Sequence, residues 1–302
     1  MYNKIIWKLN WYFRKLLTKL NIKRKYLIGN TYIKLDYNHT LPNNQLRFPY
    51  YDRFLPHFVK HLPANSSVVD VGANVGDTLI GMANANANLE YICIEADNNF
   101  FNDLKINVLT LLKQFPALKV HTVKQFVGKE IDNIILESAE GAEGTKSAKI
   151  GGEIKSKCLD VILSECGIDV KNLSLIKTDV DGFDYDVIRS SYEAMSYKPF
   201  IYFECQYKNP QQLDEYRLVF KELKDKGYER FAFFDNYGQY MCKLENIEEI
   251  YSLLSYIAKQ NFQGGSRTFG YYDILAYSPT SNDLVSSILK DYNALELIKK
   301  FK

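Results

Sequence analysis

Residues Val69-Asp-Val-Gly-Ala-Asn-Val-Gly76 lie where an apolar run that begins at Ser67 changes into a segment of helical composition. Glycine tolerates backbone conformations that other residues avoid, so Gly72 and Gly76 permit a sharp turn from a strand into a helix. In doubly wound α/β proteins this first turn leaves room for a nucleoside against the main chain. The stretch therefore predicts an α/β fold with a ligand-binding crevice at the turn.

The rest of the chain alternates between short β-rich runs and helical stretches. The predicted strands are 67–71, 91–95, 120–127, 173–179, 200–205, 228–234 and 271–277, and the predicted helices are 77–87, 98–113, 184–195 and 211–226, with one more between the last two strands. This alternation is typical of a mostly parallel sheet covered by helices on both faces. We expect one such domain at residues 62–302, including a flap or hairpin at 137–157, after an N-terminal extension at residues 1–61.

Basic residues are distributed unevenly along the chain. Residues 1–25 hold eight Lys and Arg and no acid, so the remaining chain has 30 basic against 36 acidic residues. A body with this net negative charge repels the phosphate backbone of nucleic acids. Nucleic acid is therefore not an expected partner.

The segment from Lys4 to Leu20 has apolar residues at helical spacing with lysines between them. This pattern predicts a basic amphipathic helix, with Trp7 and Trp11 beside its apolar stripe. Two interpretations stay open. The helix can lie in the interface of an anionic membrane, which would make residues 4–25 a peripheral membrane contact. Alternatively, it can pack on the body of the protein or on a second subunit.

The cysteines and the N-terminus both bear on location. The five cysteines are widely spaced and form neither CxxC pairs nor a disulfide framework. The N-terminus lacks the apolar core and cleavage site of a signal peptide, and no run approaches the roughly 18 apolar residues that span a bilayer. We expect a cytoplasmic protein, peripheral on the cytoplasmic membrane face if the N-terminal helix binds lipid.

Glu95 follows Gly76 by nineteen residues and ends the second predicted strand. A carboxylate at this place can accept hydrogen bonds from both ribose hydroxyls of a nucleoside. The dinucleotide fingerprint has a middle glycine near the pyrophosphate, but this chain has Asn74 there. S-adenosylmethionine has no phosphate, and its positive end suits the acidic Asp70. We therefore expect S-adenosylmethionine as cofactor, with NAD and a purely structural turn as the alternatives.

A second motif, Leu175-Ile-Lys-Thr-Asp-Val-Asp-Gly-Phe-Asp184, ends a predicted strand in acids and a glycine. Ligands of open α/β sheets bind beyond the carboxyl ends of the strands, so Asp179 and Asp181 are expected in the same crevice as the first motif. Asp184 is expected to cap the next helix. Glu204 ends the neighbouring strand and faces either the crevice or a structural partner. With the two aspartates it could supply a general base or hold a divalent metal, and we favour the base.

Four short motifs occur in order along the predicted domain: Val69–Gly76, Ile94-Glu-Ala-Asp97, Leu159-Asp160 and Ile176-Lys-Thr-Asp-Val-Asp-Gly182. Together they resemble the FkbM family of S-adenosylmethionine-dependent methyltransferases, over about residues 66–207. The resemblance implies the class I methyltransferase fold, a doubly wound, mostly parallel, Rossmann-like sheet of seven strands. Family members mostly methylate hydroxyl oxygens of sugars or natural products. The chain departs from the family pattern at Asp181, where Glu is usual, and at Phe183, where a small residue is usual.

Each predicted site residue thus has an expected role. The expected cofactor-binding residues are Asp70, Gly72, Asn74, Gly76 and Glu95, with Gln125 and Phe126 beside the adenine and Asp179 near the methionine or methyl group. Asp181 and Glu204 are expected to serve acceptor chemistry. The expected reaction is methyl transfer to a hydroxyl oxygen, with a sugar in a glycan or glycolipid as acceptor. A small natural product is the alternative acceptor, and a non-catalytic S-adenosylmethionine-binding protein or an NAD oxidoreductase is the alternative function.

Overall fold

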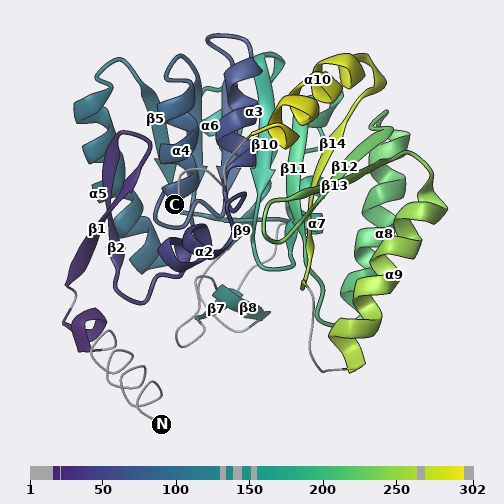
Figure 1. Ribbon diagram of the computed structural model, residues 1–302, viewed down its shortest axis with the longest axis horizontal. Helices are drawn as coiled ribbons and strands as arrows, with labels where there is room; N and C mark the ends of the chain where they lie inside the picture. Colours follow the sequence, from purple (N-terminus) through teal and green to yellow (C-terminus); the bar gives the residue numbers. More distant parts are fainter. Residues whose placement is uncertain are drawn as a thin grey trace.

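The computed structural model describes residues 16–20, 22–129, 134–138, 145–150, 155–263 and 269–295. Its centre is an eight-stranded sheet in the order β13-β12-β14-β11-β10-β3-β4-β5 (Figure 1). The five strands from β11 to β5 run parallel, and β14 is antiparallel to both of its neighbours. The predicted doubly wound, mostly parallel fold is confirmed. The strand β13 adds an eighth member to the seven expected.

Seven strands of this sheet overlap the predicted ones. Their bounds are β3 Ser67–Val71, β4 Glu90–Ile94, β5 Lys119–Val123, β10 Leu173–Thr178, β11 Phe200–Cys205, β12 Arg230–Asp235, β13 Tyr240–Leu244 and β14 Tyr272–Tyr277. Every residue of β3 is buried. A central parallel strand is apolar on both faces because helices cover both sides of the sheet. For this reason, the central strands are continuous apolar runs in the sequence.

Two layers of helices cover the sheet. One face packs against α3 Phe54–Phe58, α4 Asp77–Ala85, α5 Asn98–Gln114 and α10 Asn282–Asn293. The other face packs against α6 Leu159–Glu165, α7 Asp184–Arg189, α8 Pro210–Asp225 and α9 Ile247–Gln263. Short 3₁₀ turns lie at Val59–His61, Val170–Asn172, Ala194–Tyr197 and Pro279–Ser281. The loops between strands and helices at the carboxyl edge of the sheet are therefore the place for a ligand.

Three predicted boundaries are corrected. The helix expected to reach residue 195 ends at Arg189, where Ser190 and Ser191 donate their hydroxyls to the carbonyls of the preceding turn. The strand expected to reach residue 127 ends at Val123, and β6 Phe126–Val127 pairs instead with β9 Ser156–Lys157. The flap or hairpin expected at 137–157 begins earlier, because β7 Ile134–Ser138 forms an antiparallel hairpin with β8 Thr145–Ile150.

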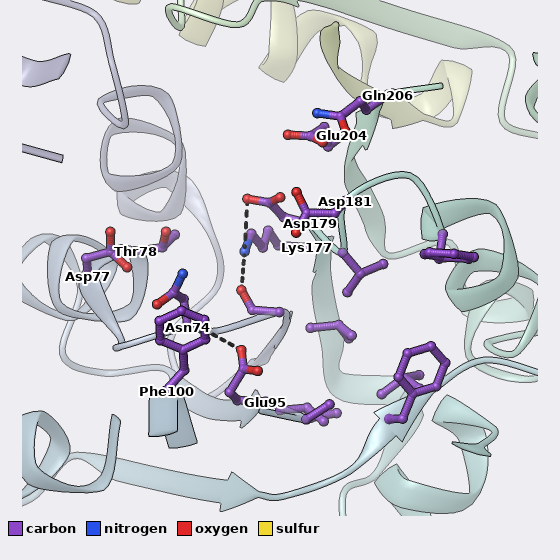
Figure 2. Close-up of a pocket in the computed structure, with 18 of the residues that line it drawn as sticks. Asn74, Asp77, Thr78, Glu95, Phe100, Lys177, Asp179, Asp181, Glu204 and Gln206 are labelled. Carbon is purple, nitrogen blue, oxygen red and sulfur yellow. Dashed lines mark hydrogen bonds and ion pairs between the residues drawn. The ribbon is translucent and has the colours of Figure 1, made fainter. Parts of the chain in front are cut away.

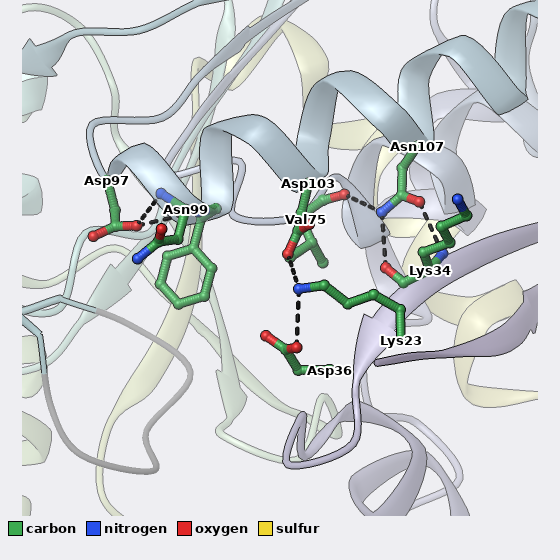
Figure 3. Close-up of polar contacts among 9 residues, drawn as sticks. Lys23, Lys34, Asp36, Val75, Asp97, Asn99, Asp103 and Asn107 are labelled. Carbon is green, nitrogen blue, oxygen red and sulfur yellow. Dashed lines mark hydrogen bonds and ion pairs between the residues drawn. The ribbon is translucent and has the colours of Figure 1, made fainter. Parts of the chain in front are cut away.

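The sequence analysis did not predict the hairpin of β1 Lys23–Ile28 and β2 Thr31–Asp36, which is followed by α2 Leu41–Arg47. The hairpin lies across α5 (Figure 3). Lys23 Nζ is 2.6 Å from Asp103 Oδ2 and 2.9 Å from Asp36 Oδ1. Asn107 of α5 accepts a hydrogen bond from the Lys34 amide and donates to the Lys34 carbonyl. Lys23 is therefore an anchor of the fold.

The described part of the N-terminal extension contributes to the same core as the sheet. Ile33, Leu35 and Phe58 are fully buried in one cluster with Val68 of β3. Most of the amphipathic helix predicted at 4–20 lies outside the described residues. The described part of that segment is helical at residues 16–19. Within the described part of the chain, no helix combines the length and apolarity needed to cross a bilayer.

Candidate active site

A cavity of about 360 Å³ lies beyond the carboxyl ends of β3, β4, β10 and β11 (Figure 2). It brings together most of the predicted site residues: Gly72, Asn74, Glu95, Gln125, Phe126, Asp179, Asp181 and Glu204. These residues come from five separate loops and strand ends, as the doubly wound topology requires. Asp70 and Gly76 are not on the cavity wall.

Gly72 is required because two loops meet at it. Its φ is +76°, and a Cβ there would lie 1.9 Å from the Asp179 carbonyl oxygen. The Asp179 amide donates to Val71 O at 3.0 Å, which joins the two loops. The sequence analysis expected this glycine to leave room for the nucleoside. The closer constraint is the backbone of the second motif.

We expected both Gly76 and Asp70 to hold the cofactor. Neither lines the cavity, so this expectation is corrected. Gly76 precedes α4 with φ +85°, and a Cβ there would lie 2.8 Å from Leu104 Cδ1, so it serves helix packing. Asp70 is 1% exposed and lies 2.8 Å from Lys177 Nζ. Its carboxylate is therefore behind the cavity wall and not at an acidic entrance.

Lys177 is the residue that the sequence analysis missed. It lies directly beside Asp70 in the register of β3 and β10, and its Nζ also donates to Gly72 O at 3.1 Å and lies 3.7 Å from Asp179 Oδ2. Burial alone lowers the pKa of a lysine, but Asp70 and Asp179 outweigh it, so the pKa of Lys177 lies above its usual range. A lysine inside an apolar central strand was the available signal, because a buried charge needs a partner.

Glu95 forms a rigid acceptor at one end of the cavity. It is 7% exposed, and its two oxygens accept hydrogen bonds from the amides of Asn74 at 2.8 Å and Asp97 at 2.7 Å. Burial raises the pKa of Glu95 to about 7, although the two amides oppose this. Each carboxylate oxygen has a second lone pair. The side chain can therefore accept further hydrogen bonds from a ligand in a fixed orientation.

Gln125 and Phe126 follow β5 and line the cavity together with Phe100. The Glu95 amide donates to the carbonyl of Val123, the last residue of β5, so this segment begins beside Glu95. The Gln125 side-chain amide donates to the carbonyls of Phe126 and Lys155. These hydrogen bonds connect the residue before β6 with the residue before β9. Two phenylalanines and a polar edge suit a flat heteroaromatic base, whose faces are apolar and whose edge is polar.

The opposite end of the cavity is acidic. The Asp179 side chain is 51% exposed, Asp181 has a φ of +54°, and Glu204 is 7% exposed. Glu204 Oε1 has no hydrogen-bond partner among the described residues. Burial raises the pKa of Glu204 well above its usual range, and the neighbouring Asp179 and Asp184 raise it further. In Figure 2 the side chains of Glu204, Gln206, Asp179 and Asp181 gather at this end, away from Glu95.

Asp184 braces the loop that carries these acids. It is the first residue of α7, and its Oδ1 accepts hydrogen bonds from Thr178 Oγ1 at 2.8 Å and the Val180 amide at 3.3 Å. Its expected role as a helix cap is therefore corrected, because the bonds go to the loop before the helix. The described residues contain no group of three His, Cys, Asp or Glu arranged to hold a metal ion.

The sheet order, with the antiparallel β14 between β11 and β12, is that of the class I S-adenosylmethionine-dependent methyltransferases. A sequence model of the methyltransferase FkbM domain matches residues 70–230, and the chain belongs to this family. No curated protein matches the chain.

Solved methyltransferases are similar to the chain at low identity. The FkbM methyltransferase from Methylobacillus flagellatus KT is 16% identical with a TM-score of 0.37, over 70% of this chain and 44% of its own longer chain. TYW2 from M. jannaschii, in complex with AdoMet, is 9% identical with a TM-score of 0.44, over 84% of both chains. An O-methyltransferase from Thermotoga maritima is 12% identical with a TM-score of 0.40, over 75% of this chain and 64% of its own.

Proposed function

We propose that the protein transfers the methyl group of S-adenosylmethionine to a hydroxyl oxygen of a sugar in a glycan or glycolipid. The observation that carries this proposal is one continuous cavity with two different buried glutamates at its ends. Glu95 accepts two backbone hydrogen bonds, whereas one oxygen of Glu204 has no partner among the described residues. The first suits the binding of a nucleoside and the second suits the removal of a proton.

The residues at the first end fit S-adenosylmethionine. Glu95 can accept from both ribose hydroxyls, because its orientation is held by the Asn74 and Asp97 amides. Phe100, Gln125 and Phe126 offer two apolar rings and an amide for the adenine. Asp179, at the acidic end of the cavity, supplies a negative charge for the positive end of the cofactor. When bound, this cofactor supplies a methyl carbon on a sulfonium, which leaves as a neutral thioether.

Glu204 and Asp181 are the proposed acceptor residues. A sugar hydroxyl is weakly acidic, so a carboxylate that takes its proton as the new bond forms speeds the reaction. Burial raises the pKa of Glu204, which makes its ionised form a stronger base than an exposed carboxylate. Asp181, on the same wall, can accept from a second hydroxyl and orient the sugar. Holding the acceptor oxygen in line with the methyl group is the main task of such a site.

Two measurements test this proposal. Calorimetry should show binding of S-adenosylmethionine and of its demethylated product S-adenosylhomocysteine, but not of NAD. Mass spectrometry of surface glycans should find a methylated sugar in cells with the protein and its unmethylated form in cells without it. Tight binding of NAD without S-adenosylmethionine would contradict the whole assignment. Cofactor binding with no change in any glycan would leave the small natural product or the non-catalytic alternative.

A further inference from the structure

A smaller chamber of about 60 Å³ opens from the acidic end of the cavity. The two spaces share Lys177, Asp179, Glu204 and Tyr271 among other residues. We call this space the inner chamber. The aromatic residues Tyr50, Phe54 and Tyr202 and the carboxyl group of Asp273 also line the inner chamber, and Asp52 lines both spaces. It is large enough for one small functional group of a ligand in the main cavity.

Three carboxyl groups line up across neighbouring strands beside this chamber. Glu204 of β11 pairs directly with Asp273 of β14 in the sheet register, and directly opposed residues point to the same face. Thr178, the last residue of β10, pairs with Phe203, so Asp179 continues the register beside Glu204. The acids of three adjacent strands therefore point into one small space.

Among the described residues, the chamber is lined by four acidic side chains and one basic side chain. Among its described lining residues, Lys177 is the only cationic side chain, and it already lies against Asp70. Burial raises the pKa of Asp273 well above its usual range, as it does for Glu204. Buried carboxylates are costly unless a cation compensates them. An anionic ligand such as a phosphate would be repelled here.

We propose that the inner chamber binds the ammonium group of the acceptor, so that the substrate is an amine-bearing alcohol such as an amino sugar with a free amine. This inference rests on the proposed methyl transfer and names its substrate class. An ammonium group donates three hydrogen bonds, which suits several converging carboxylates. Aromatic walls favour a cation further, because the ring quadrupole attracts it once water is removed. A neutral hydroxyl in the same place would leave the buried charge uncompensated.

The test compares amines with neutral molecules of similar size, using protein saturated with S-adenosylhomocysteine. The probes are glucosamine against glucose and ethanolamine against ethylene glycol, measured by ligand-observed NMR titration. We expect each amine to bind roughly tenfold more tightly than its neutral counterpart, as one charge-assisted contact allows. Equal affinity within each pair would overturn the proposal.

Two variants locate the effect. Asp273→Asn and Asp52→Asn remove one charge each, and Asn tolerates the positive φ of 55° at position 52. In both variants, each amine should bind about as tightly as its neutral counterpart. The control Asp225→Asn changes an exposed residue at the end of α8 and should keep the tighter binding of the amines. A preference that survives in both chamber variants would place the amine elsewhere and contradict the proposal.

Binding of S-adenosylhomocysteine to the same proteins distinguishes failure of this inference from failure of the proposed function. S-adenosylhomocysteine should bind the wild type and all three variants equally, which also shows that they fold. If it binds none of them, the proposed function fails, while the amine preference is still measured on the cofactor-free protein. Amine binding that S-adenosylhomocysteine abolishes would assign the chamber to the ammonium of the cofactor, and competition by magnesium instead of amines would assign it to a metal. Either result would overturn the proposal.

Discussion

Glu95 and Glu204 occupy the two ends of one cavity and are equally buried, with 7% of each residue exposed. Glu95 has a backbone amide on each oxygen, whereas Glu204 Oε1 has no partner in the described part of the chain. Burial raises the pKa of both. The comparison teaches that burial alone does not define the role of a carboxylate. A buried carboxylate held by backbone donors, such as Glu95, is a fixed hydrogen-bond acceptor. A buried carboxylate oxygen without such donors, as in Glu204, is available to take up a proton or to bind a cation.

The largest expected effect is at Lys177, which lies between the two ends. Lys177→Met would leave Asp70 buried without its cation, and breaking a buried pair in this way costs about 3 to 5 kcal/mol of unfolding free energy. Urea denaturation measures the loss. The double variant Asp70→Asn/Lys177→Met removes both charges and should regain most of it. An unchanged single variant would show that the pair contributes nothing.

The acceptor end is tested by Glu204→Gln, which keeps the shape of the side chain and removes the base. We expect methyl transfer to fall by about 100-fold or more, the usual contribution of general base catalysis. Calorimetry with S-adenosylhomocysteine should give an unchanged affinity, because the change is remote from Glu95. Full activity in this variant would remove Glu204 from the mechanism.

The nucleoside end is tested by Glu95→Ala, which removes the fixed acceptor. Binding of S-adenosylhomocysteine should weaken by about 1 to 3 kcal/mol if the ribose hydroxyls lose desolvated hydrogen bonds. The variant must be shown to fold, since the amides of Asn74 and Asp97 also lose their acceptor. Unchanged affinity in a folded variant would exclude the ribose contact.

The most gradual effect, small over any one pH unit, is the pH dependence of stability that Glu95 contributes. Its pKa is about 7 in the folded protein and 4.5 without the fold, so the folded state binds the proton more tightly. This contribution is complete below pH 4.5 and is lost as the pH rises to about 7, by at most about 1.4 kcal/mol per pH unit. Unfolding curves of cofactor-free Glu95→Gln should show a flatter profile than the wild type. Identical profiles would contradict the raised pKa.

The sequence predicted seven of the eight strands of the sheet, because most of them are compact apolar runs bounded by turn residues. The bounds of β3 and β11 agree with the predicted strands, and β10 differs by one residue. The hairpin β1–β2 was missed although Thr31, Ile33 and Leu35 alternate inward. Its stability depends on α5, to which Asn107 and Asp103 attach it. Such a contact between distant segments leaves no local pattern.

The candidate site divides in the same way. Local sequence was sufficient to find Gly72, Asn74, Glu95, Asp179, Asp181 and Glu204, because turns and acids at strand ends are short-range features. Only the tertiary structure showed that Asp70 is buried against Lys177, that Gly72 makes room for the Asp179 carbonyl, and that Asp273 lies beside Glu204. These relations depend on which strands become neighbours and in which register. Hydrogen bonds between distant segments set that register, and the order of residues along one segment cannot specify it.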